Sequence, residues 1–256
     1  MPKWMRELDR LVRGDATRIS VLRQGGIDVT SDALQIAIVV LGLVYGVCMG
    51  TYCLLKGDAT AWLQFFSGIV KVPALFLLTL LVTFPSLYVF NALVGSRLPL
   101  AALWRLLMSS MAITLAVLAS FGPIVAFFSV STTSYSFMLL LNVLVCGASG
   151  ILGLKFLMQT LHRLSVLDSN SKQMSDDATE KTEPEGALDT LDGQVLGPHL
   201  RFVFRVWILV FALVGAQMSW ILRPFLGSPE KPFEFLRSRE SNFFEAVWQH
   251  IVNLFH

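Results

Sequence analysis

Apolar residues fill long, nearly unbroken stretches of the chain, and polar residues gather between them. A helix needs about 20 mostly apolar residues to cross about 30 Å of hydrocarbon. Five stretches meet that length, at about 34–55, 72–95, 104–130, 136–160 and 202–222. The pattern predicts an all-α fold: a polytopic membrane helical bundle with four spans in 34–163 and a fifth in 201–224.

One further apolar stretch, TAWLQFFSGIV at 60–70, is followed by Lys71 and Pro73. Its length is about half of what a span needs. We therefore predict an interfacial or re-entrant half-helix that leads into the second span, in preference to a sixth span.

Residues 1–33 precede the first span and contain a helical pattern with two faces. The apolar face has Trp4, Leu8, Leu11 and Val12, and the basic face has Lys3, Arg6, Arg10 and Arg13. A basic amphipathic helix of this kind either lies on an anionic lipid surface or packs, solvated, against another part of the protein. The sequence leaves both arrangements open.

Residues 225–256 end in a second amphipathic pattern, for which Ser241 is a typical N-cap. The apolar face has Phe244, Val247, Trp248, Ile251, Val252 and Phe255, and the polar face has Asn242, Glu245, Gln249 and Asn253. About 15 residues are too few to span a bilayer, so we predict an interfacial helix.

The composition agrees with membrane embedding. Of 256 residues, 54% are apolar and 15% are charged, and the mean hydropathy is +0.64. Soluble domains have about 25% charged residues. No Asp or Glu lies between Asp58 and Asp168, or in the fifth span. Proton coupling through a buried carboxylate and intramembrane aspartyl proteolysis are therefore disfavoured.

Residues 164–200 differ sharply, with eight acidic residues, two lysines and no aromatic residue. Such a segment cannot bury enough apolar surface to offset the entropy of ordering it. We predict a disordered linker.

Lys and Arg collect on the cytoplasmic side of membrane proteins. With an internal N-terminus, the inner side receives 14 of them and the outer side 6. This count predicts an inner-membrane protein with a cytoplasmic N-terminus and an outer C-terminus.

Two spans contain small residues at spacings that allow close helix packing. Gly42, Gly46 and Gly50 recur every four residues in the first span, and Ser149 and Gly153 do so in the fourth. Small residues let two helix backbones approach closely. We predict that the first span packs against another helix, either of this chain, of a second copy or of a partner membrane protein.

Neutral polar residues within the spans are the candidates for a solute path, namely Asn91, Asn142 and Gln217. Such residues also join helices by hydrogen bonds worth about 0.6–2 kcal/mol. Helix joining is the favoured interpretation.

The three cysteines lie in apolar runs, and the four histidines lack metal-ligand spacing. We expect no cofactor, no metal site, no catalytic site and no nucleic-acid partner.

The stretch after the fifth span interleaves phenylalanines with balanced charges. Trp220, Arg223 and Pro224 are typical of a helix leaving the membrane. We predict a salt-bridged outer cap formed by Arg223, Glu234, Arg237, Arg239 and Glu240. A binding surface at the same residues is the alternative.

Three stretches carry a resemblance to a known set of proteins. They are KVPALFLLTLLVTFPSLYVFNALVGSRL at 71–98, ASGILGLKFL at 148–157 and GAQMSWILRPFLGSPEKPFEFLRSRESNFFEAV at 215–247. The chain resembles uncharacterised bacterial five-span membrane proteins over 34–163 and 201–247, and its plan is similar to that of Yip-type, Rab-interacting membrane proteins. The resemblance implies five helices, a cytoplasmic N-terminus and a role in organising membranes or partner proteins.

These observations favour a non-enzymatic membrane protein that organises membranes or assembles partners. The alternative is a small transporter or channel for a neutral or anionic solute, lined by the polar residues named above.

Overall fold

The computed structural model describes residues 2–17, 29–56, 61–93, 100–178, 198–222 and 243–255. Seven α-helices and one 3₁₀-helix make up the regular structure of these ranges. They are α1 (Lys3–Val12), η1 (Asp15–Thr17), α3 (Ser31–Lys56), α4 (Ala61–Leu93), α5 (Leu100–Ser131), α6 (Tyr135–Ala178), α7 (Pro198–Leu222) and α8 (Phe243–Phe255). The predicted all-α class is confirmed.

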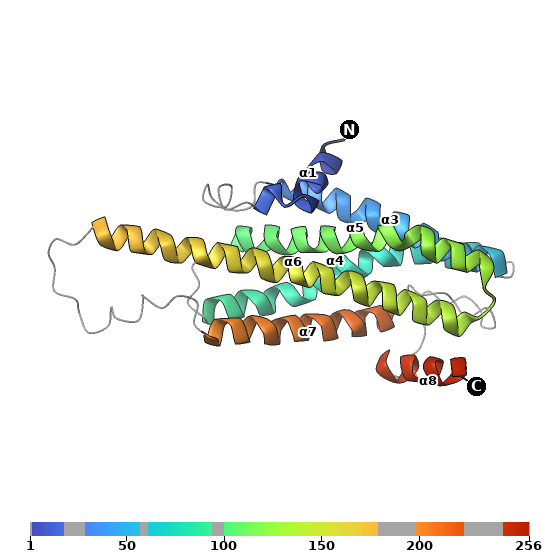
Figure 1. Ribbon diagram of the computed structural model, residues 1–256. Coiled ribbons are helices and arrows are strands. Elements are labelled where there is room, and N and C mark those ends of the chain that lie inside the picture. Colours follow the sequence, from blue (N-terminus) through green and yellow to red (C-terminus); the bar gives the residue numbers. More distant parts are fainter. Residues whose placement is uncertain are drawn as a thin grey trace.

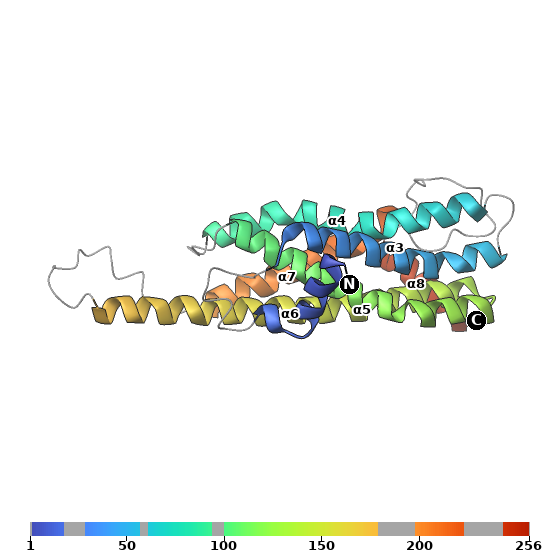
Figure 2. The same cartoon turned by 90° about the horizontal axis from the view of Figure 1, so that it is seen from above.

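The five long helices form an elongated bundle in which consecutive members run antiparallel (Figure 1). α3 packs against α4 and α5, α5 also packs against α6, and α4 also packs against α7. Seen from above, α4 and α6 lie along opposite margins of the bundle (Figure 2). We call the end where α3 begins, near α1, the α1 end, and the end where α3 finishes, near α8, the α8 end.

Four helices contain a stretch long and apolar enough to cross a membrane, at Ser31–Leu55, Ala61–Ser86, Leu103–Ser131 and Tyr135–Thr160. α7 contributes a fifth, shorter apolar stretch at Val206–Ser219. The chain is therefore a multi-span membrane protein.

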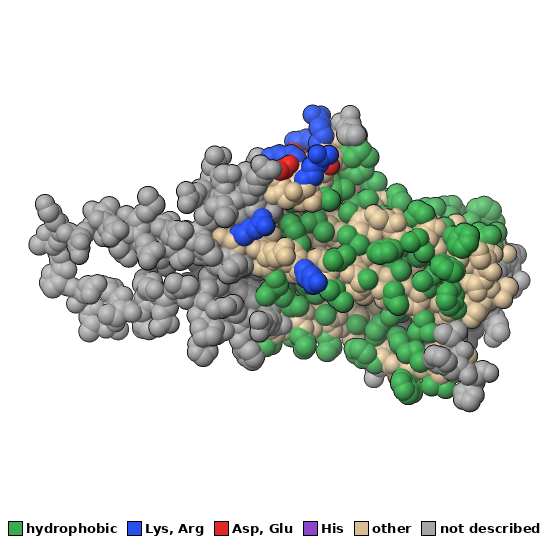
Figure 3. All heavy atoms as spheres, in the orientation of Figure 1, with side chains coloured by type: hydrophobic (Ala, Val, Ile, Leu, Met, Phe, Trp, Pro, Cys, Tyr) green, Lys and Arg blue, Asp and Glu red, His purple; other side chains and the backbone are tan. Residues whose placement is uncertain are grey.

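The outer surface of the bundle agrees with this assignment. Large apolar side chains are 65–69% exposed at Phe127, Val130, Leu144 and Leu209. Hydrophobic side chains cover much of the visible face towards α8, whereas Lys and Arg gather over α1 (Figure 3). An apolar surface of this extent is unfavourable in water but is the normal lipid-facing surface of a membrane helix.

The second span begins earlier than the sequence predicted. The structure places 61–70 in the first turns of α4, a single helix of 33 residues, so this stretch is neither a separate half-helix nor a sixth span. Pro73 and Pro85 both lie inside α4. Because α4 starts at Ala61, Lys71 lies within the span and not at its flank.

The predicted linker also needs a correction. α6 has 44 residues and continues to Ala178, so 164–178 is helical and not disordered. Residues 179–197, the remainder of the linker up to α7, lie outside the described residues. Extending a helix that already exists is far easier than nucleating a new one, so a polar sequence can continue α6 beyond its span.

Candidate functional site

The N-terminal helix α1 is fixed on the bundle, packed against α3 and α5. Its Leu11 is only 1% exposed and belongs to the main hydrophobic core. Of the two arrangements that the sequence left open, the structure thus shows the one in which α1 packs on the protein. Lys3 and Arg6 remain exposed on its outer side.

Gly14 ends α1 and turns the chain towards η1. Its φ of 78° lies in the left-handed region, which favours glycine at the end of a helix. Its N–H donates to the carbonyl of Leu11 at 3.0 Å, and the N–H of Arg13 donates to the carbonyl of Asp9 at 2.9 Å. These bonds cap the C-terminal end of α1.

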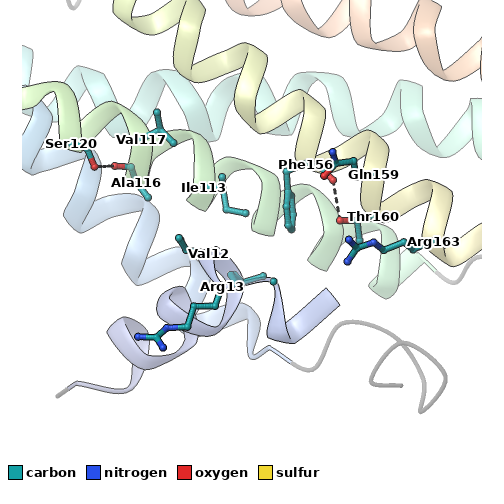
Figure 4. Close-up of a pocket in the computed structure, with 12 residues that line it drawn as sticks. Val12, Arg13, Ile113, Ala116, Val117, Ser120, Phe156, Gln159, Thr160 and Arg163 are labelled. Atoms are coloured by element: carbon teal, nitrogen blue, oxygen red, sulfur yellow. Dashed lines mark hydrogen bonds between the residues drawn. The ribbon is translucent and has the colours of Figure 1, made fainter. Parts of the chain in front are cut away.

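A hollow of about 430 Å³ lies beneath this end of α1, between α5 and α6. We call it the α1 hollow. Its lining comprises Leu11, Val12, Arg13 and Gly14 from α1 and its cap, Ile113, Ala116, Val117 and Ser120 from α5, and Phe156, Gln159, Thr160 and Arg163 from α6. Figure 4 shows Thr160 and Arg163 towards one end, Val117 and Ser120 towards the other, and Val12 and Arg13 across from them.

The hydroxyl groups of the α1 hollow are already bonded to their own helices. Ser120 Oγ donates to the carbonyl of Ala116 at 2.8 Å, and Thr160 Oγ1 donates to the carbonyl of Phe156 at 2.9 Å. Their protons are therefore used within the helices. The lining also includes the amide of Gln159 and the guanidinium of Arg163, two exposed side chains of α6.

Two arginines of the α1 region are paired with acidic residues of the same helix. Arg13 Nε donates to Asp9 Oδ1 at 2.9 Å, and Arg10 Nη1 donates to Glu7 Oε2 at 3.2 Å. The bond to Asp9, with the charge of that carboxylate, raises the pKa of Arg13 above its ordinary value. Each of these α1 carboxylates is thus neutralised by an arginine of α1.

The glycines of the first span lie against α4 of the same chain. A Cβ atom at Gly42 would be 2.9 Å from Cβ of Pro73, one at Gly46 would be 2.8 Å from Cα of Ile69, and one at Gly50 would be 2.5 Å from Cδ2 of Phe65. Any larger residue would push the helices apart. Since α4 occupies this face, no room is left there for a second copy or a partner helix.

The small residues of the fourth span have different surroundings from each other. A Cβ atom at Gly153 would collide with Thr114 Oγ1, and Ser110 Oγ donates to the carbonyl of Gly153 at 2.9 Å. Gly153 is therefore a point of close contact between α5 and α6. Ser149 is fully buried, and its Oγ donates to the carbonyl of Val145 at 2.8 Å.

Two of the three polar candidates for a solute path, Asn142 and Gln217, have described side chains, and they lie on different helices, α6 and α7. Tyr45 OH donates to Asn142 Oδ1 at 2.7 Å, and Asn142 Nδ2 donates to the carbonyl of Met138 at 2.8 Å. Asn142 is fully buried and thus joins α6 to α3. Gln217 is half-buried on α7, and the side chain of Asn91 lies outside the described residues.

Sequence reasoning missed the role of Tyr45. A tyrosine hydroxyl in the middle of a span needs a hydrogen-bond partner, because no water is present to supply one. That requirement was the available signal, and it would have directed attention to Asn142.

A second missed feature is the pair Ser67 and Lys71 on α4. Lys71 is only 7% exposed, and Ser67 Oγ is buried with no hydrogen-bond partner in the described part of the chain. Lys71 is ten residues beyond Ala61, about 15 Å along the helix and so half-way through a bilayer core. The contacts of Gly42 with Pro73 and of Gly46 with Ile69 place it at the same depth, beside the middle of α3.

The C-terminal helix α8 packs against α6 and α7. Its His250 Nδ1 lies 3.1 Å from Ser136 Oγ, and its ring meets that of Tyr135 with centroids 5.5 Å apart. Burial lowers the pKa of His250 below its ordinary value. The outer face of α8 keeps Phe244 and Trp248 56% and 66% exposed.

The predicted outer cap, made of Arg223, Glu234, Arg237, Arg239 and Glu240, lies outside the described residues. Cys48, Cys53 and Cys146 form no disulfide. Among the described residues, no group of three or more His, Cys, Asp and Glu side chains could hold a metal ion.

Comparison with known proteins does not assign the chain to a family. No protein-family model, no curated protein and no solved structure matches the chain. The resemblance to bacterial five-span proteins therefore stays a prediction.

Proposed function

We propose that this chain is a non-enzymatic inner-membrane protein that organises the membrane or assembles partner proteins, with five spans, a cytoplasmic N-terminus and an outer C-terminus. The observation that carries the proposal is the fixing of a short amphipathic helix at each end of the bundle. α1 exposes mostly charged residues, and α8 exposes Phe244 and Trp248 beside the polar Glu245 and Gln249. A protein that holds partner proteins at a membrane needs one surface for lipid and another for the partners, and α8 and α1 offer two different surfaces of this kind.

The interior of the bundle supports the same proposal. Gly46 and Gly153 lie at close helix contacts, and the fully buried Asn142 is bonded to Tyr45. These groups hold helices of the same chain together.

The experiment is site-specific photo-crosslinking in native membranes. A photoreactive residue replaces Arg6 on α1 or Trp248 on α8, and the control replaces Leu144, a 68% exposed lipid-facing residue of α6. We expect reproducible adducts with one protein, or with a second copy of this chain, from α1 or α8 and lipid adducts alone from Leu144. Lipid adducts alone at all three positions would refute the proposal.

One observation favours the alternative, a transporter or channel for an anionic solute. Lys71 is a lysine buried at mid-depth in α4, four residues from Ser67, whose hydroxyl has no hydrogen-bond partner among the described residues. Ionisable residues at this depth are costly and frequently mark a solute path. The path would run past Lys71 and Ser67 and not past Asn142, whose amide is already bonded.

A flux assay in proteoliposomes tests the alternative with a panel of small anions. If it holds, flux exceeds that of protein-free vesicles and is lost in Lys71→Met, whereas Lys155→Met, which removes an exposed cation of α6, retains it. Flux equal to that of protein-free vesicles removes this alternative.

A further inference from the structure

We propose that the outer face of α1 binds the headgroups of anionic phospholipids, with Lys3 and Arg6 as the contacts. This inference goes beyond the function proposed above, because it concerns the lipid around the protein and holds whether or not a protein partner binds. Lys3 and Arg6 are three residues apart, a spacing that places both on one face of a helix. Both side chains are exposed.

Lys3 and Arg6 are the two cations of α1 that its own carboxylates do not hold. Each of those carboxylates, on Glu7 and Asp9, accepts a hydrogen bond from another arginine. In the described part of the chain, neither Lys3 nor Arg6 makes a side-chain hydrogen bond or an ion pair. Their charges are therefore left to interact with whatever surrounds the protein.

The position of α1 brings these charges to the membrane surface. Its C-terminal end lines the α1 hollow together with Thr160, the last residue of the apolar stretch of α6. The hollow is also lined by Ile113, which lies within the apolar stretch of α5. This end of α1 thus lies where hydrocarbon meets headgroups. The 10 residues of α1 span about 15 Å, so Lys3 and Arg6 lie within that distance of the boundary.

The remainder of the exposed surface of α1 favours a lipid over a soluble anion. Met5 is 40% exposed and Val12 is 62% exposed, and their spacing of seven residues places them on one side of the helix. A phospholipid offers a phosphate to the two cations and methylene groups to the two apolar side chains. A soluble anion offers nothing to the apolar side chains. Helices that bind membrane surfaces combine these two kinds of contact.

α1 needs no rearrangement to meet a headgroup, because the bundle already holds it in place. Leu11 is 1% exposed, and the N–H of Gly14 caps the end of the helix. A site that is formed in advance avoids the entropy cost of ordering its side chains' backbone on binding. Each Lys or Arg close to an anionic membrane surface then contributes a preference of about fivefold.

Photoactivatable lipids test the proposal on the full-length protein in phosphatidylcholine vesicles. The vesicles contain a trace of photoactivatable phosphatidylglycerol or phosphatidylcholine, and mass spectrometry maps the adducts onto α1 and α8. We expect phosphatidylglycerol to label α1 more strongly than phosphatidylcholine does. Lys3→Gln and Arg6→Gln should each lower the phosphatidylglycerol yield on α1 by about fivefold, whereas Lys3→Arg should retain it. The yield on α8, which has no Lys or Arg, should stay unchanged.

Two controls separate this contact from general effects. Lys155→Gln removes an exposed cation from α6, outside α1, and should retain the yield on α1. Hydrogen exchange of the α1 amides shows whether each variant keeps α1 docked, and it should be unchanged because Leu11 is still present. A lower yield with unchanged exchange reports a lost lipid contact and not an undocked helix.

Three outcomes would overturn the inference. The first is equal labelling of α1 by the two lipids. The second is an equal loss in Lys155→Gln and Arg6→Gln, which would indicate attraction by the overall charge of the protein. The third is displacement of the adducts by millimolar inorganic phosphate, which would indicate a site for the free anion.

Failure of this inference is distinguishable from failure of the proposed function. Protein adducts at Arg6 in native membranes, without a preference of α1 for phosphatidylglycerol, would assign the two cations to an acidic protein partner. The proposed function would then stand and the lipid contact would fall. Lipid adducts alone in native membranes, with a clear preference for phosphatidylglycerol, would have the opposite meaning.

Discussion

α1 and α8 are both short amphipathic helices packed on the bundle, but their outer faces differ: that of α1 is mostly charged, whereas that of α8 combines large apolar side chains with Glu245 and Gln249. α1 buries Leu11 against the core and exposes Lys3 and Arg6. α8 turns its polar His250 inward, onto Ser136, and exposes Phe244 and Trp248. Helical periodicity alone identifies two faces of a helix but does not say which face meets the protein.

The difference lies in what each helix meets. α1 packs on the apolar surfaces of α3 and α5, so burying Leu11 removes apolar area from water. α8 packs where α6 begins, and there Tyr135 and Ser136 offer a ring and a hydroxyl to a histidine. The free apolar face of α8 is then suited to lipid at the interface, where tryptophan is enriched. Four changes, in order of decreasing effect, test this contrast.

Leu11→Ala should have the largest effect, because it removes the buried anchor of α1. Replacing a buried leucine by alanine costs about 2–5 kcal/mol, enough to weaken the docking of α1 severely. Hydrogen exchange of the α1 amides measures the loss. Met5→Ala, at a position 40% exposed on the same helix, is the control and should leave exchange nearly unchanged. Equal protection of α1 in both variants would contradict the role of Leu11.

Gly14→Ala should have the next largest effect. Alanine at a φ of 78° costs about 1–2 kcal/mol, so the end of α1 should fray and the α1 hollow should lose one wall. Amide exchange at 11–14 reports the change. The control is Gly147→Ala in α6, where an added Cβ meets nothing within 4 Å and alanine favours the helix. Unchanged exchange in Gly14→Ala would show that the turn tolerates a side chain.

The third test uses pH at the α8 end. Burial lowers the pKa of His250 in the folded protein, so the unfolded chain binds a proton more readily. Stability from this contact is therefore present at neutral pH and falls as the pH drops below the ordinary value of 6.5. Hydrogen exchange measured across this pH range should show that the amides of α8 lose protection. The protection of the α1 amides should not change.

His250→Ala should abolish that pH dependence and cost about 0.5–1.5 kcal/mol, the usual contribution of one hydrogen bond. Ser136→Ala removes the other partner and should cost about as much. Protection of α8 that is independent of pH in the wild type would contradict this assignment.

Local patterns predicted much of the fold and part of the α1 and α8 surfaces. The long apolar stretches indicated the membrane helices, and the spacing of Gly42, Gly46 and Gly50 pointed to a close helix contact whose partner only the structure identifies as α4. The start of α4 was placed too late, because Lys71 was taken as the flank of a span. Its burial against neighbouring helices depends on tertiary packing, which no local pattern contains.

The amino-acid composition of 164–178 did not predict that α6 extends through these residues. Residues 164–178 are too polar to form a core, but a helix that enters from a span needs no core to continue. Asp168 and Lys172 are also four residues apart, a spacing at which opposite charges support a helix. The α1 hollow was beyond prediction for another reason: its three walls come from distant parts of the sequence, and α1 completes it only by docking.

Trp248→Ala should have the smallest effect on the bundle. Trp248 is 66% exposed, so its removal should change the stability of the protein in detergent by less than about 0.5 kcal/mol. In vesicles the result should differ, because the indole favours the membrane interface and its loss should free α8 from the lipid surface. Hydrogen exchange of α8 in detergent and in vesicles measures both effects. Lys3→Ala, the corresponding change on the exposed face of α1, should alter neither, because α1 is held by Leu11. If Trp248→Ala destabilises the protein equally in detergent and in vesicles, the indole packs on protein and α8 is anchored as α1 is.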